Sequence, residues 1–116
     1  MTPQEYLEVV LQTYGPDMQD DVLFNMIGIA GEAGEIANMA QKAARGDFRA
    51  EDLSAPEVRE PEQRQKLIEE LGGLLYFFTA LAHFLGTDFE EIRRVNAAKL
   101  LARLERGTIR GDGDDR

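Results

Sequence analysis

The chain lacks cysteine altogether and contains a single histidine, His83, among its 116 residues. Without cysteine it forms neither disulfides nor thiolate-bound metal sites, and cysteine usage gives no indication of its redox compartment. One histidine is too few for a zinc site built from imidazoles. His83 itself lies in an apolar helical segment, which favours a core or interface position over a role as a base.

Long apolar runs and an excess of basic residues are also absent. No apolar run is long enough to span a bilayer and no signal-peptide pattern opens the chain, so we expect a cytoplasmic protein with no membrane partner. The net charge of −9 argues against a nucleic acid polymer as partner, because phosphate backbones require a basic surface. An acidic protein can still bind a small polyphosphate when a metal ion supplies positive charge.

Apolar residues recur with a helical period through most of the chain, and there is neither a convincing strand pattern nor an internal repeat. The length fits one domain that can bury a core. The pattern predicts an all-α fold of four helices near residues 2–14, 22–45, 61–85 and 88–106. These helices make one domain, 1–106, followed by a glycine-rich C-terminal tail at 107–116.

Capping and breaking residues mark the ends of these helices. Thr2 and Pro3 suit an N-cap and a first turn. Thr87 with Glu90 three residues later predicts a capping box for the last helix. The other expected boundaries are a cap at Asp20 or Asp21, helix stops at Gly46 and Gly86, and an exposed loop at 47–60.

An acid pair stands out in the second helical segment, at residues 28–36. Glu32 and Glu35 are three residues apart, so both carboxylates lie on one helix face about one turn apart. They are the only charges in a segment that otherwise resembles core, although two solvated acids on an exposed face remain the plain alternative. The helix around them also has three glycines at three-residue spacing, which predicts a closely packed ridge: Gly28, Gly31 and Gly34.

A second acidic position follows in the next helix, where Glu70 stands beside small and apolar residues. Its neighbour Glu69 points about 100° away and suits an ordinary surface position. Buried acids are unfavourable unless something cationic lies between them. Mg²⁺ is the expected cation, with Mn²⁺ as a substitute, because Mg²⁺ prefers oxygen ligands and usually binds together with substrate phosphates.

The last helix presents Asn96, Lys99 and Arg103 on one side, at spacings of three and four residues. An amide, an ammonium and a guanidinium in this arrangement suit a phosphate chain, and Lys42 is a further candidate of the same kind. The alternative is a solvated basic face paired with nearby acids. The aromatic cluster of the third helix favours packing, although a nucleobase pocket could use one of its members: Tyr76, Phe77 and Phe78.

The combination Gly31-Glu32-Ala33-Gly34-Glu35, Glu69-Glu70-Leu71-Gly72 and Asn96-x-x-Lys99 resembles the MazG-like family of all-α nucleoside triphosphate pyrophosphohydrolases. The glycine-rich tail is similar to the ending of one branch of that family. The resemblance implies Mg²⁺-dependent hydrolysis of a (deoxy)nucleoside triphosphate to a monophosphate and pyrophosphate. It further implies that acids from two helices, here Glu32, Glu35 and Glu70, are the metal-binding and catalytic residues.

The same resemblance implies that Asn96, Lys99 and Arg103 on the last helix contact phosphates or sugar. Lys42 is a further candidate phosphate ligand by its position, and Arg110 and Arg116 of the tail are candidates for closing over the phosphates. The family pairs an E-x-x-E motif with an E-x-x-D motif, and the position of the aspartate is occupied here by Gly73. The site therefore has one carboxylate fewer, which weakens metal binding and affects turnover more if two ions are required.

Three functions follow from these observations. The first is a Mg²⁺-dependent pyrophosphohydrolase, and the second is a nucleotide-binding protein of the same fold that is weakened or inactive because of Gly73. The third is a helical interaction protein whose acids are all solvated. The apolar helix faces are wider than one antiparallel bundle needs, which favours a homodimer or a homotetramer built as a dimer of dimers.

Overall fold

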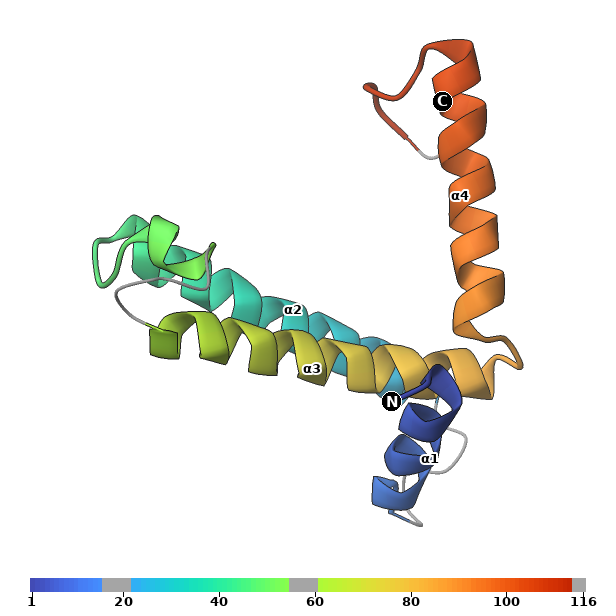
Figure 1. Cartoon of the computed structure of the whole chain (residues 1–116), viewed down its shortest axis with the longest axis horizontal. Coiled ribbons are helices and arrows are strands. Elements are labelled where there is room, and N and C mark those ends of the chain that lie inside the picture. Colours follow the sequence, from blue (N-terminus) through green and yellow to red (C-terminus); the bar gives the residue numbers. More distant parts are fainter. Residues whose placement is uncertain (16–21, 55–60, 114–116) are drawn as a thin grey trace.

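The computed structural model describes residues 1–15, 22–54 and 61–113, and these ranges are helical without any strand (Figure 1). The predicted all-α, four-helix fold is confirmed. The order of elements is α1 (Pro3–Thr13), α2 (Val22–Ala44), the 3₁₀ helix η2 (Ala50–Leu53), α3 (Pro61–Phe84) and α4 (Phe89–Arg106).

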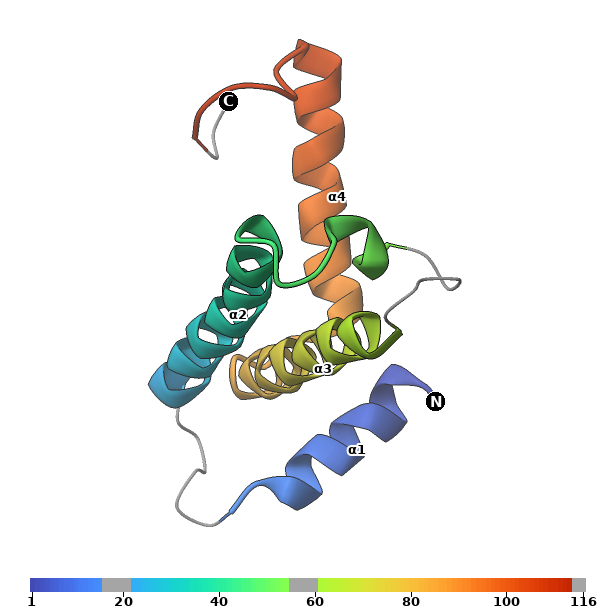
Figure 2. The same cartoon turned by 90° about the vertical axis from the view of Figure 1, so that its left-hand side faces the viewer.

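The centre of the fold is a hairpin in which α2 and α3 lie side by side (Figures 1 and 2). The ring of Phe77 on α3 rests on Gly28 of α2, and a Cβ at position 28 would lie 2.6 Å from Phe77 Cγ. The predicted close approach is therefore confirmed at Gly28. It is wrong within this single copy for Gly31 and Gly34, because no described atom lies within 4 Å of a Cβ at either position.

The short helix α1 packs against the C-terminal half of α3 through aromatic residues. The ring of Tyr14 stacks on Tyr76 with centroids 5.8 Å apart and planes 9° apart. The Thr13 hydroxyl donates to the Tyr76 hydroxyl at 3.0 Å, and the Tyr14 hydroxyl donates to the side chain of the fully buried Asn25 on α2. Tyr76 is thus used for packing, which supports the first of the two interpretations of the aromatic cluster.

The N-terminus of α1 has the predicted cap. The Thr2 hydroxyl accepts from the backbone N–H of Glu5, and the Glu5 carboxylate accepts from the backbone N–H of Thr2. The expected cap at Asp20 or Asp21 lies outside the described residues.

The predicted cap of α4 is wrong by one residue. The Asp88 carboxylate accepts from the backbone N–H of Glu91 at 2.8 Å, while the Thr87 hydroxyl bonds the side chain of Glu91 instead. Both Asp and Thr are good N-caps, so in a Thr-Asp pair the conformation of the preceding turn determines which of the two residues caps the helix.

The connection between α2 and α3 also differs from the expected exposed loop. Its described part contains η2, which lies against α3 and α2 and in which Asp52 is buried. Phe48, two residues before η2, is an apolar residue in a charged stretch and is buried as well. A single apolar residue gives no periodic signal, which is why the sequence pattern indicates only a loop.

A turn at Gly86 directs α4 away from the other helices (Figures 1 and 2). Gly86 has a φ of 71°, and the backbone N–H of Thr87 donates to the carbonyl of Ala82 at 2.9 Å. The radius of gyration is 17.3 Å, against about 13 Å for a compact chain of this length. One copy is therefore open, with α4 as a projecting arm.

Few apolar side chains are fully covered in this open shape. The buried ones among the described residues are Val10, Met39, Phe48, Ala80 and Ala82. By length and composition alone α3 is the one described helix that could cross a membrane, a test that core helices of soluble proteins also pass. The buried apolar core of the described residues is thus small for a chain of 116 residues.

Candidate functional site

The acids predicted from the two motifs come together across the α2–α3 hairpin. Glu32 projects from α2 and Glu70 from α3, both half-buried, and the two side chains share a hydrogen bond. The carboxylate of Glu32 also lies directly over Gly73, since a Cβ at position 73 would be only 2.6 Å from Glu32 Cδ. The hairpin therefore brings Glu32, Glu70 and position 73 into one place.

Crowding of negative charge perturbs this cluster. The pKa of Glu70 is raised, first because partial burial disfavours its charged form and then because of the charges of Glu32 and Glu35. The hydrogen bond with Glu32 and the charge of Glu69 act in the same direction. A hydrogen bond between two carboxyl groups requires a proton on one of them, so the contact with Glu32 adds to the effect of burial and charge on the pKa of Glu70.

The donor atoms of this cluster are carboxylate oxygens, which are the ligands that Mg²⁺ prefers. Within the described ranges, however, no group of three or more His, Cys, Asp and Glu side chains is arranged to hold a metal ion. Glu32 and Glu70 already converge, whereas Glu35 is exposed and reaches them only through its charge. A three-carboxylate site therefore requires Glu35 to turn toward the other two, a rotation that an exposed side chain can make.

Gly73 occupies the position where the resembled motif has an aspartate. Its missing side chain leaves the space into which the Glu32 carboxylate extends. The resemblance predicts only that one acid is missing at this position. The structure shows that an acid from the neighbouring helix fills the same space, which no pattern within a single helix could reveal.

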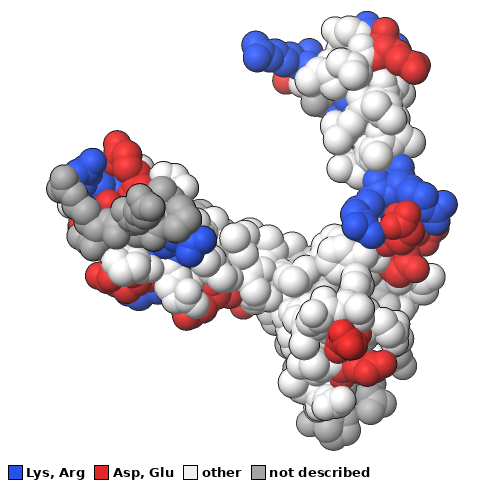
Figure 3. All heavy atoms as spheres, in the orientation of Figure 1, with Lys and Arg blue, Asp and Glu red and all other residues white. Residues whose placement is uncertain are grey.

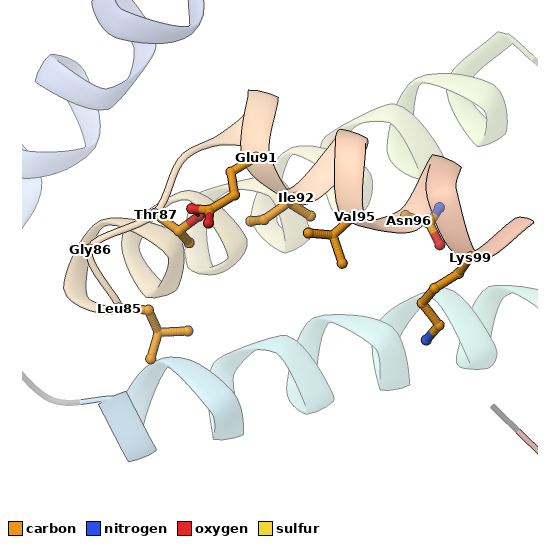
Figure 4. Close-up of a pocket in the computed structure, with 8 residues that line it drawn as sticks. All are labelled: Leu85, Gly86, Thr87, Glu91, Ile92, Val95, Asn96 and Lys99. Atoms are coloured by element: carbon orange, nitrogen blue, oxygen red, sulfur yellow. Dashed lines mark hydrogen bonds between the residues drawn. The ribbon is translucent and has the colours of Figure 1, made fainter. Parts of the chain in front are cut away.

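The amide and the ammonium of α4 line a separate pocket of about 540 Å³ in the angle between α3 and α4 (Figure 4). Asn96 and Lys99 stand at one end of it, and Figure 4 shows both on the same side of α4. The rest of the lining is mainly apolar, with Leu85, Ile92 and Val95. Because α4 projects from the hairpin, it does not pack along α2 or α3, and these two polar side chains are not brought to the acids within one copy.

The remaining predicted substrate contacts are spread over the molecule. Arg103 is buried, 8% exposed, where the tail folds back: the backbone N–H of Thr108 donates to the carbonyl of Arg103 at 2.8 Å. Arg110 is exposed in this tail, and Arg116 lies outside the described residues. Arg103 lies on the same face of α4 as Asn96 and Lys99, but it is buried whereas those two side chains are exposed.

Lys42 lies in the last turn of α2, on the same helix face as Glu35 and about two turns further along. It is exposed and close to Asp47, whose pKa is lowered chiefly by a hydrogen bond with Arg45 and to a smaller extent by the charge of Lys42. The Arg45–Asp47 ion pair is 2.7 Å long. Lys42 therefore interacts with Asp47 at the end of α2, away from the cluster of Glu32 and Glu70.

Comparison with known proteins gives two relatives. The chain is 33% identical over 100 residues to the Gene 37 protein of Mycobacterium phage L5, covering 86% of this chain and 81% of that protein. It is 30% identical over 92 residues to the uncharacterized protein YvdC of Bacillus subtilis strain 168, covering 79% and 78% of the two chains. No family model and no solved structure matches.

Proposed function

The chain belongs to the family of the Gene 37 protein of Mycobacterium phage L5 and protein YvdC of Bacillus subtilis, and for this member we propose Mg²⁺-dependent hydrolysis of a (deoxy)nucleoside triphosphate to a monophosphate and pyrophosphate. The substrate would be a free cytoplasmic nucleotide, neither a nucleic acid polymer nor a membrane component. The resemblance of the acidic motifs to MazG-like enzymes supports this reaction class.

The observation that carries the proposal is the convergence of Glu32 and Glu70 across the hairpin, next to Glu35. Ionised acids that lie close together in a partly buried place repel one another and lose hydration unless a cation is bound. The same two effects, burial and neighbouring negative charge, raise the pKa of Glu70. A site of this kind gains stability when a divalent cation neutralises it. Oxygen-only ligands select Mg²⁺ or Mn²⁺ over metals that prefer nitrogen or sulfur.

Glu32, Glu35 and Glu70 would hold the cation, whose charge, when it is bound, stabilises the negative charge that develops on the phosphates. A carboxylate oxygen left over from metal binding accepts a hydrogen bond from the attacking water and takes its proton. The water oxygen forms the new bond to the α-phosphorus, the bond from that phosphorus to the α–β bridging oxygen breaks, and pyrophosphate leaves. Asn96 and Lys99 would bind the phosphate chain from α4.

The test is pyrophosphate release from a panel of nucleoside triphosphates with Mg²⁺ or Mn²⁺. We expect the unaltered protein to be active and Glu35→Gln to lose the activity, because an amide oxygen is a weaker ligand without charge. Glu69→Gln is the matched control, since Glu69 is exposed on the same helix as Glu70 and should retain activity. Equal activity in Glu35→Gln and the unaltered protein would refute the role of the acids.

A second function is favoured by one specific observation, the glycine at position 73. If the site needs a carboxylate from α3 at this position, the protein binds nucleotide with weakened or no turnover. Titration calorimetry would then show binding without product, and Gly73→Asp would restore release of pyrophosphate. The position of Glu32 favours the first function, because its carboxylate already occupies the space in question.

We also propose that the protein works as a homodimer or as a dimer of dimers. Large apolar side chains are exposed on α2, α3 and α4 of a single copy, more than a monomeric soluble protein usually leaves uncovered.

A further inference from the structure

We infer that the joint between α1, α3 and α4 holds a binding site for a small, uncharged, planar molecule with one polar edge, of the class of aromatic amides and lactams. The site is a pocket of about 300 Å³ formed by the N-terminal end of α1, the last turns of α3 and the first turn of α4, which meet as Figure 1 shows. This volume is at the lower end of the range for small-molecule pockets in proteins.

The polar part of the pocket is a hydroxyl group without a partner, next to an imidazole. Thr79 lines the pocket, is 5% exposed, and has the one buried side-chain oxygen or nitrogen atom among the described residues that makes no hydrogen bond. A buried hydroxyl without a partner is unfavourable. Threonine populates two χ1 rotamers in a helix, so this hydroxyl can turn towards a ligand while the backbone stays in place.

His83 lines the same pocket one helical turn after Thr79. Residues at this spacing share a helix face, with Cβ atoms about 5–6 Å apart. A neutral imidazole has one donor and one acceptor, and a hydroxyl is both. The two side chains therefore suit the edge of an amide or a lactam, in which a carbonyl and an N–H group lie next to each other.

The apolar part of the pocket suits a flat ring. It comes from all three helices: Pro3, Leu7, Ala82 and Phe89. The ring of Phe89 packs against Phe78 with centroids 5.0 Å apart, so it forms a fixed aromatic wall. A ring bound against this wall contacts α1, α3 and α4 at once.

The charged side chains of the pocket already have partners, which favours an uncharged ligand. Arg93 pairs with Glu90 at 2.8 Å, and Figure 3 shows basic and acidic side chains in contact at the start of α4. The Asp88 carboxylate accepts from the backbone N–H of Glu91 at 2.8 Å. A charged ligand would compete with these interactions, whereas a neutral one binds groups that make no hydrogen bond within the described ranges.

The pocket is separate from the acids of the proposed catalytic site. Thr79 and Glu70 are nine positions apart in α3. This spacing places them about 13 Å apart along the axis and on opposite sides of the helix. Asn96 and Lys99 line a different pocket. The binding site at the joint therefore does not depend on the proposed reaction.

Nuclear magnetic resonance tests binding directly, because His83 is the only histidine and its imidazole signals are unique. The probes are benzamide and 2-pyridone, and toluene is the control without a polar edge. We expect both probes to shift the His83 signals saturably, with a Kd on the order of 1 mM for molecules of this size, and toluene to bind more weakly. No saturable shift with either probe, or equal affinity for toluene, would overturn the inference.

Thr79→Val tests the hydroxyl, since it replaces that group by a methyl group of similar size. We expect it to weaken the binding of benzamide about 2- to 10-fold, which corresponds to one hydrogen bond, while Thr79→Ser binds more tightly than Thr79→Val. The matched control is Thr108→Val, which removes a hydroxyl from the C-terminal tail, outside the pocket, and should leave the affinity unchanged. Equal affinity of Thr79→Val and the unaltered protein would overturn the inference.

Thermal melting without a probe tests the observation that the Thr79 hydroxyl has no partner. Removing a buried group that makes no hydrogen bond should leave the melting temperature of Thr79→Val equal to that of the unaltered protein or above it. A lower melting temperature would show that the hydroxyl bonds the protein itself, and it would overturn the inference. Neither experiment depends on release of pyrophosphate.

Discussion

Replacing Gly28 by alanine tests the closest contact between α2 and α3. The new methyl group would lie 2.6 Å from Cγ of Phe77, whose ring is held between the two helices and against Phe24, with ring centroids 6.0 Å apart. The obstacle is a ring inside the hairpin, which can move only together with its neighbours. Gly72 provides the matched control in α3, because no described atom lies within 4 Å of a Cβ there.

The two substitutions share one energetic contribution and differ in another. Alanine in place of glycine inside a helix stabilises by about 1 kcal/mol in both cases. Forcing a methyl group into a filled contact costs about 1–3 kcal/mol, and only Gly28→Ala incurs this cost. The free energy of unfolding of Gly28→Ala should therefore be about 1–3 kcal/mol below that of Gly72→Ala. This corresponds to a melting temperature lower by roughly 4–12 °C.

Urea denaturation followed by far-ultraviolet circular dichroism measures this difference at a fixed protein concentration. Comparing the variants with each other removes the common gain in helix propensity, so the difference reports the steric contact alone. If both variants unfold at the same urea concentration, Phe77 does not rest on Gly28 and the packing of the hairpin described above is wrong.

Without added metal, Glu70→Gln should raise the melting temperature at neutral pH more than Glu69→Gln, because it removes a crowded acid. Because the pKa of Glu70 is raised in the folded protein, its carboxylate lowers the free energy of unfolding at pH values above that pKa, and this effect disappears as the pH falls through it. The rise in melting temperature caused by Glu70→Gln should therefore vanish on acidification. Thermal melts over a pH series measure this. Mg²⁺ should raise the melting temperature of the unaltered protein more than that of Glu70→Gln, and equal shifts would contradict a cation site there. At the start of α4, Asp88→Ala should cost about 1 kcal/mol in chemical denaturation, and Thr87→Ala should cost less, since only Asp88 accepts from the helix backbone.

The fold class could be predicted because helical periodicity is a property of consecutive residues. All four expected helices are present, with ends a few residues from the expected positions. The errors concern choices that depend on distant residues. Phe48 is buried beside η2 although no apolar pattern surrounds it in the sequence, and the cap at Asp88 depends on how the turn at Gly86 leaves α3.

The candidate site was predictable to the same extent. Spacing places Glu32 and Glu35 on one helix face, and composition marks Glu70 as an acid among apolar residues. Residue spacing within a helix does not predict how that helix is oriented relative to the other helices. Asn96 and Lys99 share a pocket as their positions suggest, yet the helix that holds them leaves the hairpin, and Arg103 on the same face is buried under the tail.

The contact between Glu32 and Gly73 makes these two positions interdependent. A larger residue at position 73 must displace the Glu32 carboxylate, so the effect of Gly73→Asp depends on the length of the side chain at position 32. Gly73→Asp combined with Glu32→Asp should therefore differ from the sum of the two single changes. In evolutionary terms we expect the pair to be epistatic, so that the effect of an acid at position 73 depends on how the side chain at position 32 is placed on the other helix.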